Sequence, residues 1–481
     1  LNQRRGGQFL LPSARPDLAV LPGNGTFGRE RELRQAFPTF FNSWSGSATI
    51  EHNFASNDRL RLSYVKSQQF VQEAFGWANS SPSPTQGQTP GYVASLSHLH
   101  TFGPRWINEF RGGFFELFNT RISLFRDITN SSLGIFNPLE GAIGGLASLM
   151  PTIDINTQRS TSGIGNAWDF FDRQRTIYVA DSVTHIRGNH TLQFGGEIRR
   201  PTIAGEYMAR TNGDLDYDNW VFFFTGHGAA GGGSDLDQGD TRRHFKMIDY
   251  AAFLQDDWRV RRGLTLNLGV RYEFFRYPID TEGRIGSFMT RDMAQRAGVQ
   301  PGYYIPENSR IFSSNFNPLQ IGLVVAPGTP LNLSQVNKAL NRSTIFPDRN
   351  NFSPRVGVAW QPQRLSWMVV RAGYGLNYER PSGAFKTDMQ LSAPFFVYQN
   401  VPAPEDMANP YPALNINPFQ IPLNVTVARD ANGAPSWRRF DGSAFPVTEP
   451  FAAKNFSFIN PFMITPKIHS WTINLQLEPF K

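Results

Sequence analysis

Charged side chains recur at every second position of several segments, and they are the first candidates for chemistry. They are Glu109, Arg111, Glu197, Arg199, Asp257, Arg259, Arg271, Glu273, Arg355 and Arg371. Two carboxylates beside an arginine could support acid–base catalysis, but a catalytic site needs its groups to converge on one pocket. These residues are instead spread along the polar side of two-residue repeats, which favours the charged wall of a hydrated lumen. We therefore assign no catalytic residue and do not expect an enzyme.

Two other groups of side chains could bind a metal ion. His98 and His100 share one parity of a predicted strand, but the sequence shows no evident third ligand, and zinc sites use at least three protein ligands. Asp214, Asp216 and Asp218 share one face of another predicted strand. Their hard carboxylate oxygens suit Ca²⁺, although the spacing is not that of an EF-hand. We therefore predict no metal site and no cofactor. If the protein does bind calcium, these three aspartates are the candidate ligands.

Aromatic side chains gather in the long segments between the alternating stretches. Trp168, Phe170, Phe171 and Trp220 are the candidates for ligand binding. Flat aromatic rings can stack on a sugar or a siderophore, and they can equally pack one loop against another. The sequence leaves both interpretations open.

Composition excludes several classes of protein. The 481 residues include no Cys, so disulfides and thiolate metal sites are impossible. The net charge of +7 is scattered singly along the chain, which argues against a nucleic-acid partner. No apolar run approaches the ~20 residues of a transmembrane helix.

The elements that must position these residues are long strands with two different faces. From Leu264 to Phe274 apolar and polar residues alternate without a break. A period of two indicates a strand with one apolar and one polar face. The preceding Arg261–Gly263 is short enough only for an antiparallel hairpin. Both arms exceed the ~5–6 residues of a typical soluble strand and match the ~9–11 of a membrane-spanning barrel strand.

The chain repeats this hairpin, and short turns alternate with long connections. After a loop or linker at 1–43, hairpins are predicted at 44–67, 90–118, 175–203, 243–277 and 352–379, with a last strand at 467–478. This alternation predicts an all-β fold, an antiparallel transmembrane β-barrel of outer-membrane type with short periplasmic turns and long extracellular loops. Trp106, Trp258 and Trp360 lie near short turns, where an interfacial aromatic girdle is expected.

Several segments resemble a known family. AAFLQDDWRVRRGLTLNLGVRYE, THIRGNHTLQFGGEIRR, NFSPRVGVAWQP, VVRAGYGLNYE and HSWTINLQLE resemble the barrel of TonB-dependent outer-membrane receptors. The resemblance is closest to the Oar-like branch, which has a carboxypeptidase-regulatory-like domain before its plug. It implies a barrel of about twenty-two strands closed by a plug, with cargo bound at the extracellular loops and uptake powered by the TonB complex. The implied partners are outer-membrane lipid, the protein's own plug domain, the TonB complex and an unidentified cargo.

The sequence departs from that family pattern in two ways. It shows no plug domain and no TonB-interacting segment before Leu1, and it provides only about 11–12 of the roughly 22 strands. We therefore expect a partial barrel in the cell outer membrane, an open sheet with edges at Trp44–Phe54 and Ile468–Leu477.

The expected function of the complete protein is energised uptake or surface binding of a large substrate, such as a siderophore, an oligosaccharide or a peptide. One alternative is a surface-structural or adhesive barrel without transport. A second is a soluble β-rich carbohydrate-binding protein.

Overall fold

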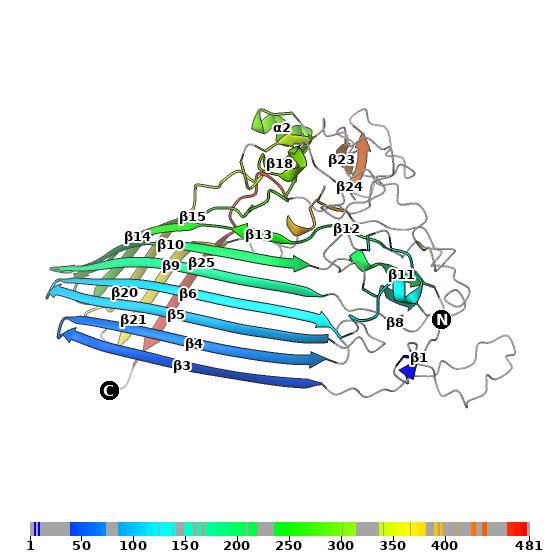
Figure 1. Ribbon diagram of the computed structural model, residues 1–481. Helices are drawn as coiled ribbons and strands as arrows, with labels where there is room; N and C mark the ends of the chain where they lie inside the picture. The colour runs from blue at the N-terminus through cyan, green and yellow to red at the C-terminus, as the bar shows by residue number, and fades with distance from the viewer. Residues whose placement is uncertain are drawn as a thin grey trace.

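The computed structural model describes residues 4–5, 8–9, 39–73, 85–124, 126–137, 139–140, 149–156, 161–164, 169–207, 210–218, 235–300, 302–313, 336–339, 341–365, 367–380, 389–392, 395–397, 410, 425–429, 435–439 and 459–478. Among these residues, eleven long strands form one curved sheet in the order β25-β21-β20-β15-β14-β10-β9-β6-β5-β4-β3 (Figure 1). Every neighbouring pair is antiparallel. The strands are β3 (Phe40–Ala55), β4 (Asp58–Glu73), β5 (Thr85–Gly103), β6 (Trp106–Ser123), β9 (Phe170–Arg187), β10 (His190–Tyr207), β14 (Asp249–Arg261), β15 (Leu264–Phe275), β20 (Phe352–Trp360), β21 (Met368–Tyr378) and β25 (Lys467–Leu477).

Several strands run further from their hairpin turns than the alternation predicts. β3 begins at Phe40, inside the predicted linker, and β4 continues to Glu73, where it pairs with Thr85 of β5. Much of the predicted connection at 68–89 is therefore strand. β9 and β10 are similarly longer, at 170–187 and 190–207. Apolar–polar alternation requires two different environments on the two faces, so it fades where both faces meet water, although the backbone still pairs.

The pairing register places the apolar alternate residues of neighbouring strands on the same side of the sheet. Ile50 lies opposite Leu62, Leu62 opposite Leu96, and Leu96 opposite Gly112. Within the described part of the chain this apolar side is uncovered, and Ile50 is 67% exposed while Leu254 is 51% exposed. A continuous exposed apolar face of this size is unlike a soluble protein surface and requires an apolar environment.

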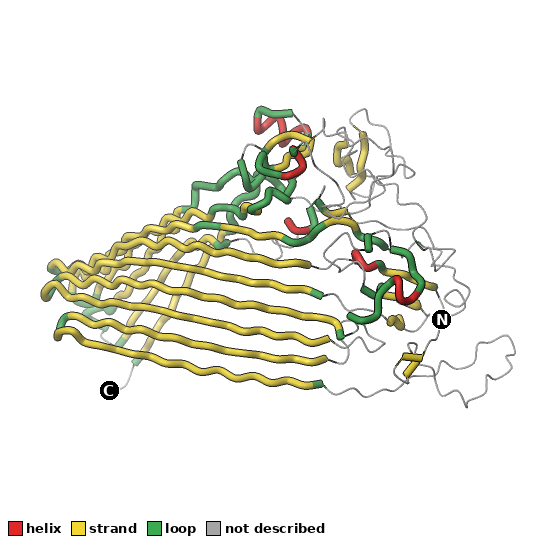
Figure 2. Tube along the Cα trace, in the orientation of Figure 1, coloured by secondary structure: helices red, strands yellow, loops and turns green. Residues whose placement is uncertain are grey.

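The two edge strands leave the sheet open. In the described residues β3 pairs only with β4 and β25 only with β21, and the two edges do not pair with each other (Figures 1 and 2). Every residue of β3 and of β25 is exposed. The expectation of an open, curved sheet with these two edges is therefore correct.

Apart from Ala180 in β9 and Phe245, which pairs with Ile203 of β10, the buried hydrophobic residues of the described chain lie in the connections beyond the sheet. Figure 1 shows these connections at the end opposite the hairpin turns. We call these connections the loop layer; its described residues fall within 124–169, 208–248, 276–351 and 379–466. One cluster consists of Phe245, Met247, Tyr277, Ile285, Ile345, Met389 and Ile459. These residues come from three connections, at 208–248, 276–351 and 379–466, so the loops pack on one another.

The loop layer contains an α-helix and several short strands among its described residues. The helix α2 (Arg291–Ala297) begins at Thr290, whose side chain accepts from the Met293 amide, and ends at Gly298 in the left-handed conformation. The strands are β7 (Thr152–Asn156), β8 (Thr161–Ile164), β11 (Asp214–Tyr217), β12 (Gln238–Gly239), β13 (Arg243–Lys246), β16 (Ile279–Asp280), β17 (Ser287–Met289), β18 (Gly302–Ile305), β19 (Val336–Lys338), β22 (Phe396–Val397), β23 (Val425–Arg429) and β24 (Pro435–Arg439). Two further short strands near the N-terminus, β1 (Arg4–Arg5) and β2 (Gln8–Phe9), pair with each other. The helices in the described part of the chain are all too short or too polar to cross a membrane.

Candidate functional site

The polar face of the sheet carries a group of four paired charges. The Glu197 carboxylate on β10 accepts from Arg271 Nη2 at 2.9 Å and forms an ion pair with Arg199, whose Nη2 is also 2.9 Å away. Arg271 on β15 also donates through Nε to Glu273 at 3.0 Å. The strand between them, β14, presents Ala251 opposite both Glu197 and Glu273. Because the alanine side chain is small, the charges of β10 and β15 meet across it.

The other predicted lumen residues lie on the same face but pair locally. Asp257 accepts from Asn267 at 2.6 Å and Glu109 from Ser97 at 3.4 Å, while Arg355 donates to Asn377 at 2.9 Å. Arg371 reaches Gln476 on β25 at 3.2 Å. Arg111 and Arg259 lie on the same face but are not members of the four-charge group. These residues form a series of cross-strand pairs along the surface of the sheet. Such a surface suits contact with water or with another polar protein surface.

A second charged group is buried in the loop layer. The Asp240 carboxylate accepts from Arg242 Nε and from Arg284 Nη1, each at 2.9 Å. Arg284 also approaches Asp280, with 3.6 Å between Nε and Oδ2. Burial raises the pKa of Asp240, but the Arg242 hydrogen bonds and the Arg284 charge outweigh it and hold this pKa below its usual value.

Arg243 extends this group and is itself buried. Its Nη2 donates to the Gln390 carbonyl at 2.9 Å, which links β13 to a distant connection. Burial lowers the pKa of Arg243 to about 10. Sequence reasoning missed this group because its members come from separate loops that share no periodicity.

The calcium candidates acquire a different third member in the structure. β11 pairs in parallel with β7, which sets Asp216 opposite Asp154. Ligand oxygens of Asp154, Asp214 and Asp216 lie within 4.8 Å of one another, and Asp218 is not in this group. Calcium binding at this position remains a prediction.

The predicted aromatic ligand contacts are only partly described. Trp168 and Trp220 lie outside the described residues, as does the side chain of Phe170. Phe171 is half-buried and lies opposite Glu206 in the β9–β10 pair. Contact between these rings and a cargo therefore remains a prediction.

Close to the hairpin turns, the otherwise apolar side of the sheet carries polar and aromatic side chains. Trp106 stacks on His185 with ring centroids 3.8 Å apart, and Trp258 stacks on His190 at 5.3 Å. His190 also contacts Asp256 at 2.7 Å. We call these residues, together with Asp58, His98 and His100, the turn-end rim. Amphipathic rings at the border of an apolar band are typical of a membrane interface.

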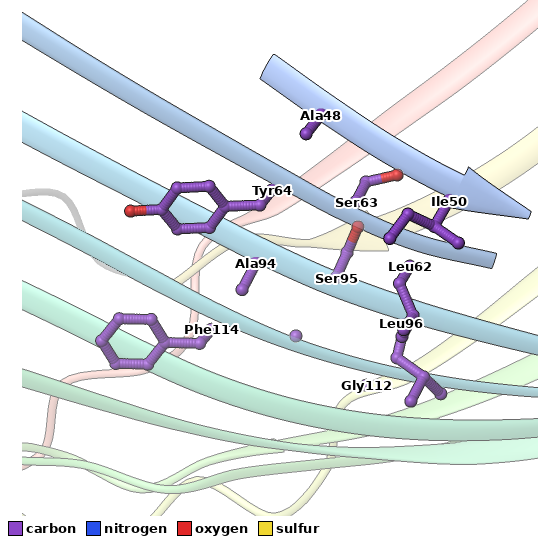
Figure 3. Close-up of a pocket in the computed structure, with 11 residues that line it drawn as sticks. Ala48, Ile50, Leu62, Ser63, Tyr64, Ala94, Ser95, Leu96, Gly112 and Phe114 are labelled. Carbon is purple, nitrogen blue, oxygen red and sulfur yellow. The ribbon is translucent and has the colours of Figure 1, made fainter. Parts of the chain in front are cut away.

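Beyond this rim the apolar side has a shallow hollow of about 400 Å³. Figure 3 shows it lined by side chains of successive strands, among them Ile50, Leu62, Leu96 and Phe114. Gly112 adds no side chain at its base and widens the space. Its lining is almost wholly apolar, so it suits hydrocarbon chains and offers no catalytic group.

Comparisons with known proteins agree with this architecture. The family model described as "Outer membrane beta barrel domain" matches residues 10–479. No curated protein sequence matches the chain.

The chain is also similar to several solved structures at low sequence identity. The copper transporter OprC is 12% identical with a TM-score of 0.39, over 72% of this chain and 38% of OprC. The ferripyoverdine receptor of the outer membrane of Pseudomonas aeruginosa is 10% identical with a TM-score of 0.41, over 72% and 36% of the two chains. The ferric-catecholate import receptor Fiu from K12 E. coli is 12% identical with a TM-score of 0.34, over 71% and 52%. The chain thus spans about a third to a half of the length of these structures.

Proposed function

This chain belongs to the outer membrane β-barrel domain family, and from that premise we propose that it forms part of the wall of a TonB-dependent receptor of the Oar-like branch. The complete receptor would take up a large substrate, such as a siderophore, an oligosaccharide or a peptide. The single observation that carries the proposal is the contrast between the sheet's two faces. One face is apolar and exposed, while the other carries the four-charge group Glu197, Arg199, Arg271 and Glu273.

The open edges support a large barrel. Unpaired backbone groups cost several kcal/mol each in hydrocarbon, so β3 and β25 need partner strands in a bilayer. Adding strands to the eleven long ones in the described residues produces a wide barrel, and wide barrels enclose a lumen that water or a plug fills. The ion-paired polar face suits that lumen, and the packed loop layer suits the mouth where cargo would bind.

The alternatives predict different behaviour. A surface-structural or adhesive barrel would use the same wall but would not depend on the TonB complex. A soluble carbohydrate-binding protein is inconsistent with family membership, because the chain is an outer-membrane protein.

We expect uptake by the full-length protein to require the TonB complex. Cells lacking the gene and cells lacking TonB should lose uptake of the same labelled compound in a panel of ferric siderophores, oligosaccharides and peptides. The matched control is a strain in which the full-length gene is restored, since restoration should recover uptake only when TonB is present. Uptake that persists without TonB, or a gene deletion that impairs only adhesion, would favour the surface-structural alternative.

The proposal also predicts the orientation of the chain in the membrane. Gly188 lies in the turn between β9 and β10, and Gly298 ends α2 in the loop layer; a Cβ at either position would meet nothing within 4 Å. Both glycines have positive φ (+60° and +69°), so each is kept in place and the short tag is inserted directly after it. We expect antibodies on intact cells to label the tag at Gly298, and to label the tag at Gly188 only after permeabilisation. Surface labelling at Gly188 would reverse the proposed sidedness.

A further inference from the structure

We propose that Asp58, His98 and His100 form a binding site for a divalent transition-metal cation of the Zn²⁺ class. His98 Nε2 lies 2.7 Å from Asp58 Oδ1, and His100 Nδ1 lies 3.0 Å from Asp58 Oδ2. One ligand atom from each of the three side chains lies within 4.8 Å of the other two. The group combines two imidazoles and a carboxylate, which are common protein ligands for zinc.

The fold holds these three side chains together on one side of the sheet. β4 and β5 pair so that Asp58 lies opposite His100 and Leu60 opposite His98. The Asn57 side chain donates to the Thr101 carbonyl at 3.0 Å, and the Thr101 amide donates to the Asn57 carbonyl at 2.8 Å. These two hydrogen bonds tie the β3–β4 turn to β5, so Asp58 keeps its place beside the two histidines.

An aromatic contact restrains one of the ligands further. The His100 ring meets Phe102 edge to face, with centroids 4.3 Å apart, and lies 6.3 Å from the His98 ring. A restrained imidazole loses less freedom when it binds a cation, which favours binding.

The geometry needs little change to accept a cation. Tetrahedral zinc with bonds of ~2.0–2.2 Å places its ligand atoms about 3.4 Å apart, and the three ligand atoms here already lie within 4.8 Å of one another. The three side chains are 25–37% exposed, so a cation can enter and a fourth position stays open to water. The cation would take the place of the hydrogen bonds between the two rings and the carboxylate. The site is at the turn-end rim, and it does not depend on the proposed transport activity.

The same rim supplies a matched comparison. His190 Nδ1 lies 2.7 Å from Asp256 Oδ2, nearly the separation between His98 and Asp58. Among the described residues, His190 and Asp256 are not part of any three-ligand group. In the turn-end rim, His190 therefore has one carboxylate partner, whereas the group at Asp58 has the three protein ligands that a zinc site uses.

The test is zinc titration of the full-length gene product in detergent, purified through a tag without histidine and stripped with a chelator. Calorimetry should show one equivalent of Zn²⁺ that His98→Ala, His100→Ala and Asp58→Asn each weaken by about 10–100-fold or more. His190→Ala should keep that equivalent unchanged. Co²⁺ bound in place of zinc should give visible absorption bands in the wild type and in His190→Ala, and the bands should vanish in the three site variants.

Folding is checked separately, because the site lies beside a hairpin turn. Circular dichroism and the heat-dependent gel mobility of the barrel should match the wild type in each variant. The more conservative His98→Asn keeps a polar side chain at the turn and should still weaken zinc binding. Equal zinc affinity in the wild type and the site variants, or the absence of zinc binding in the wild type, would overturn the proposal.

Discussion

Replacing Arg284 by methionine is expected to destabilise the loop layer by about 3 kcal/mol, the low end of the range for breaking a buried ion pair, because the change removes the cation beside Asp280 and leaves Asp240 paired with Arg242 alone. Arg284 contacts Asp240 at 2.9 Å and Asp280 at 3.6 Å. The Asp240 and Asp280 residues are only 3% and 2% exposed, so water cannot compensate for the missing charge. Methionine keeps much of the side-chain volume, so the effect isolates charge from packing.

Hydrogen exchange measures this effect locally. The free energy of opening of the amides at 280–285 should fall in Arg284→Met, while the amides of β9 and β10 should change little. Arg310→Met is the matched control, since Arg310 is 72% exposed in its side chain and lies 4.0 Å from Glu282. An exposed pair of this kind contributes about 0–1 kcal/mol. Equal losses in the two variants would show that the buried carboxylates do not depend on Arg284.

Replacing Leu62 by arginine is expected to cost about 2–4 kcal/mol, whereas arginine at the adjacent Ser63 should cost far less. Leu62 faces the apolar side between Ile50 and Leu96, and Ser63 faces the polar side between Thr49 and Ser95. The two positions are neighbours in one strand, so they share depth and backbone pairing and differ only in the face that they present.

The measurement is the unfolding free energy of the full-length protein in lipid vesicles. Leu62 is a better position than Leu268, because Leu268 lies opposite Asp256 on the same face, and an introduced arginine there could pair with that carboxylate. Similar losses at Leu62 and Ser63 would contradict the assignment of the apolar side to lipid.

The hairpins and the two faces of the sheet could be predicted from the sequence because they depend on local information. A period of two assigns each residue to a side, and a short polar turn such as Arg261–Gly263 fixes the antiparallel return. The ends of the strands at the loop layer could not be predicted in the same way. There Phe40–Ser43 and the stretch up to Glu73 keep strand pairing without the alternation that reveals it.

The groups that bring distant segments together depended on the tertiary structure. His98 and His100 were recognisable as a pair of histidines on one strand face, but their third partner, Asp58, lies across the β4–β5 register. Asp154 joins Asp214 only through the parallel pairing of β7 and β11. Sequence alone determined which side of each strand is apolar, since that follows from each residue and its neighbours. Which residues meet across strands and loops was decided by the register and by loop packing, because these depend on contacts between residues far apart in the chain.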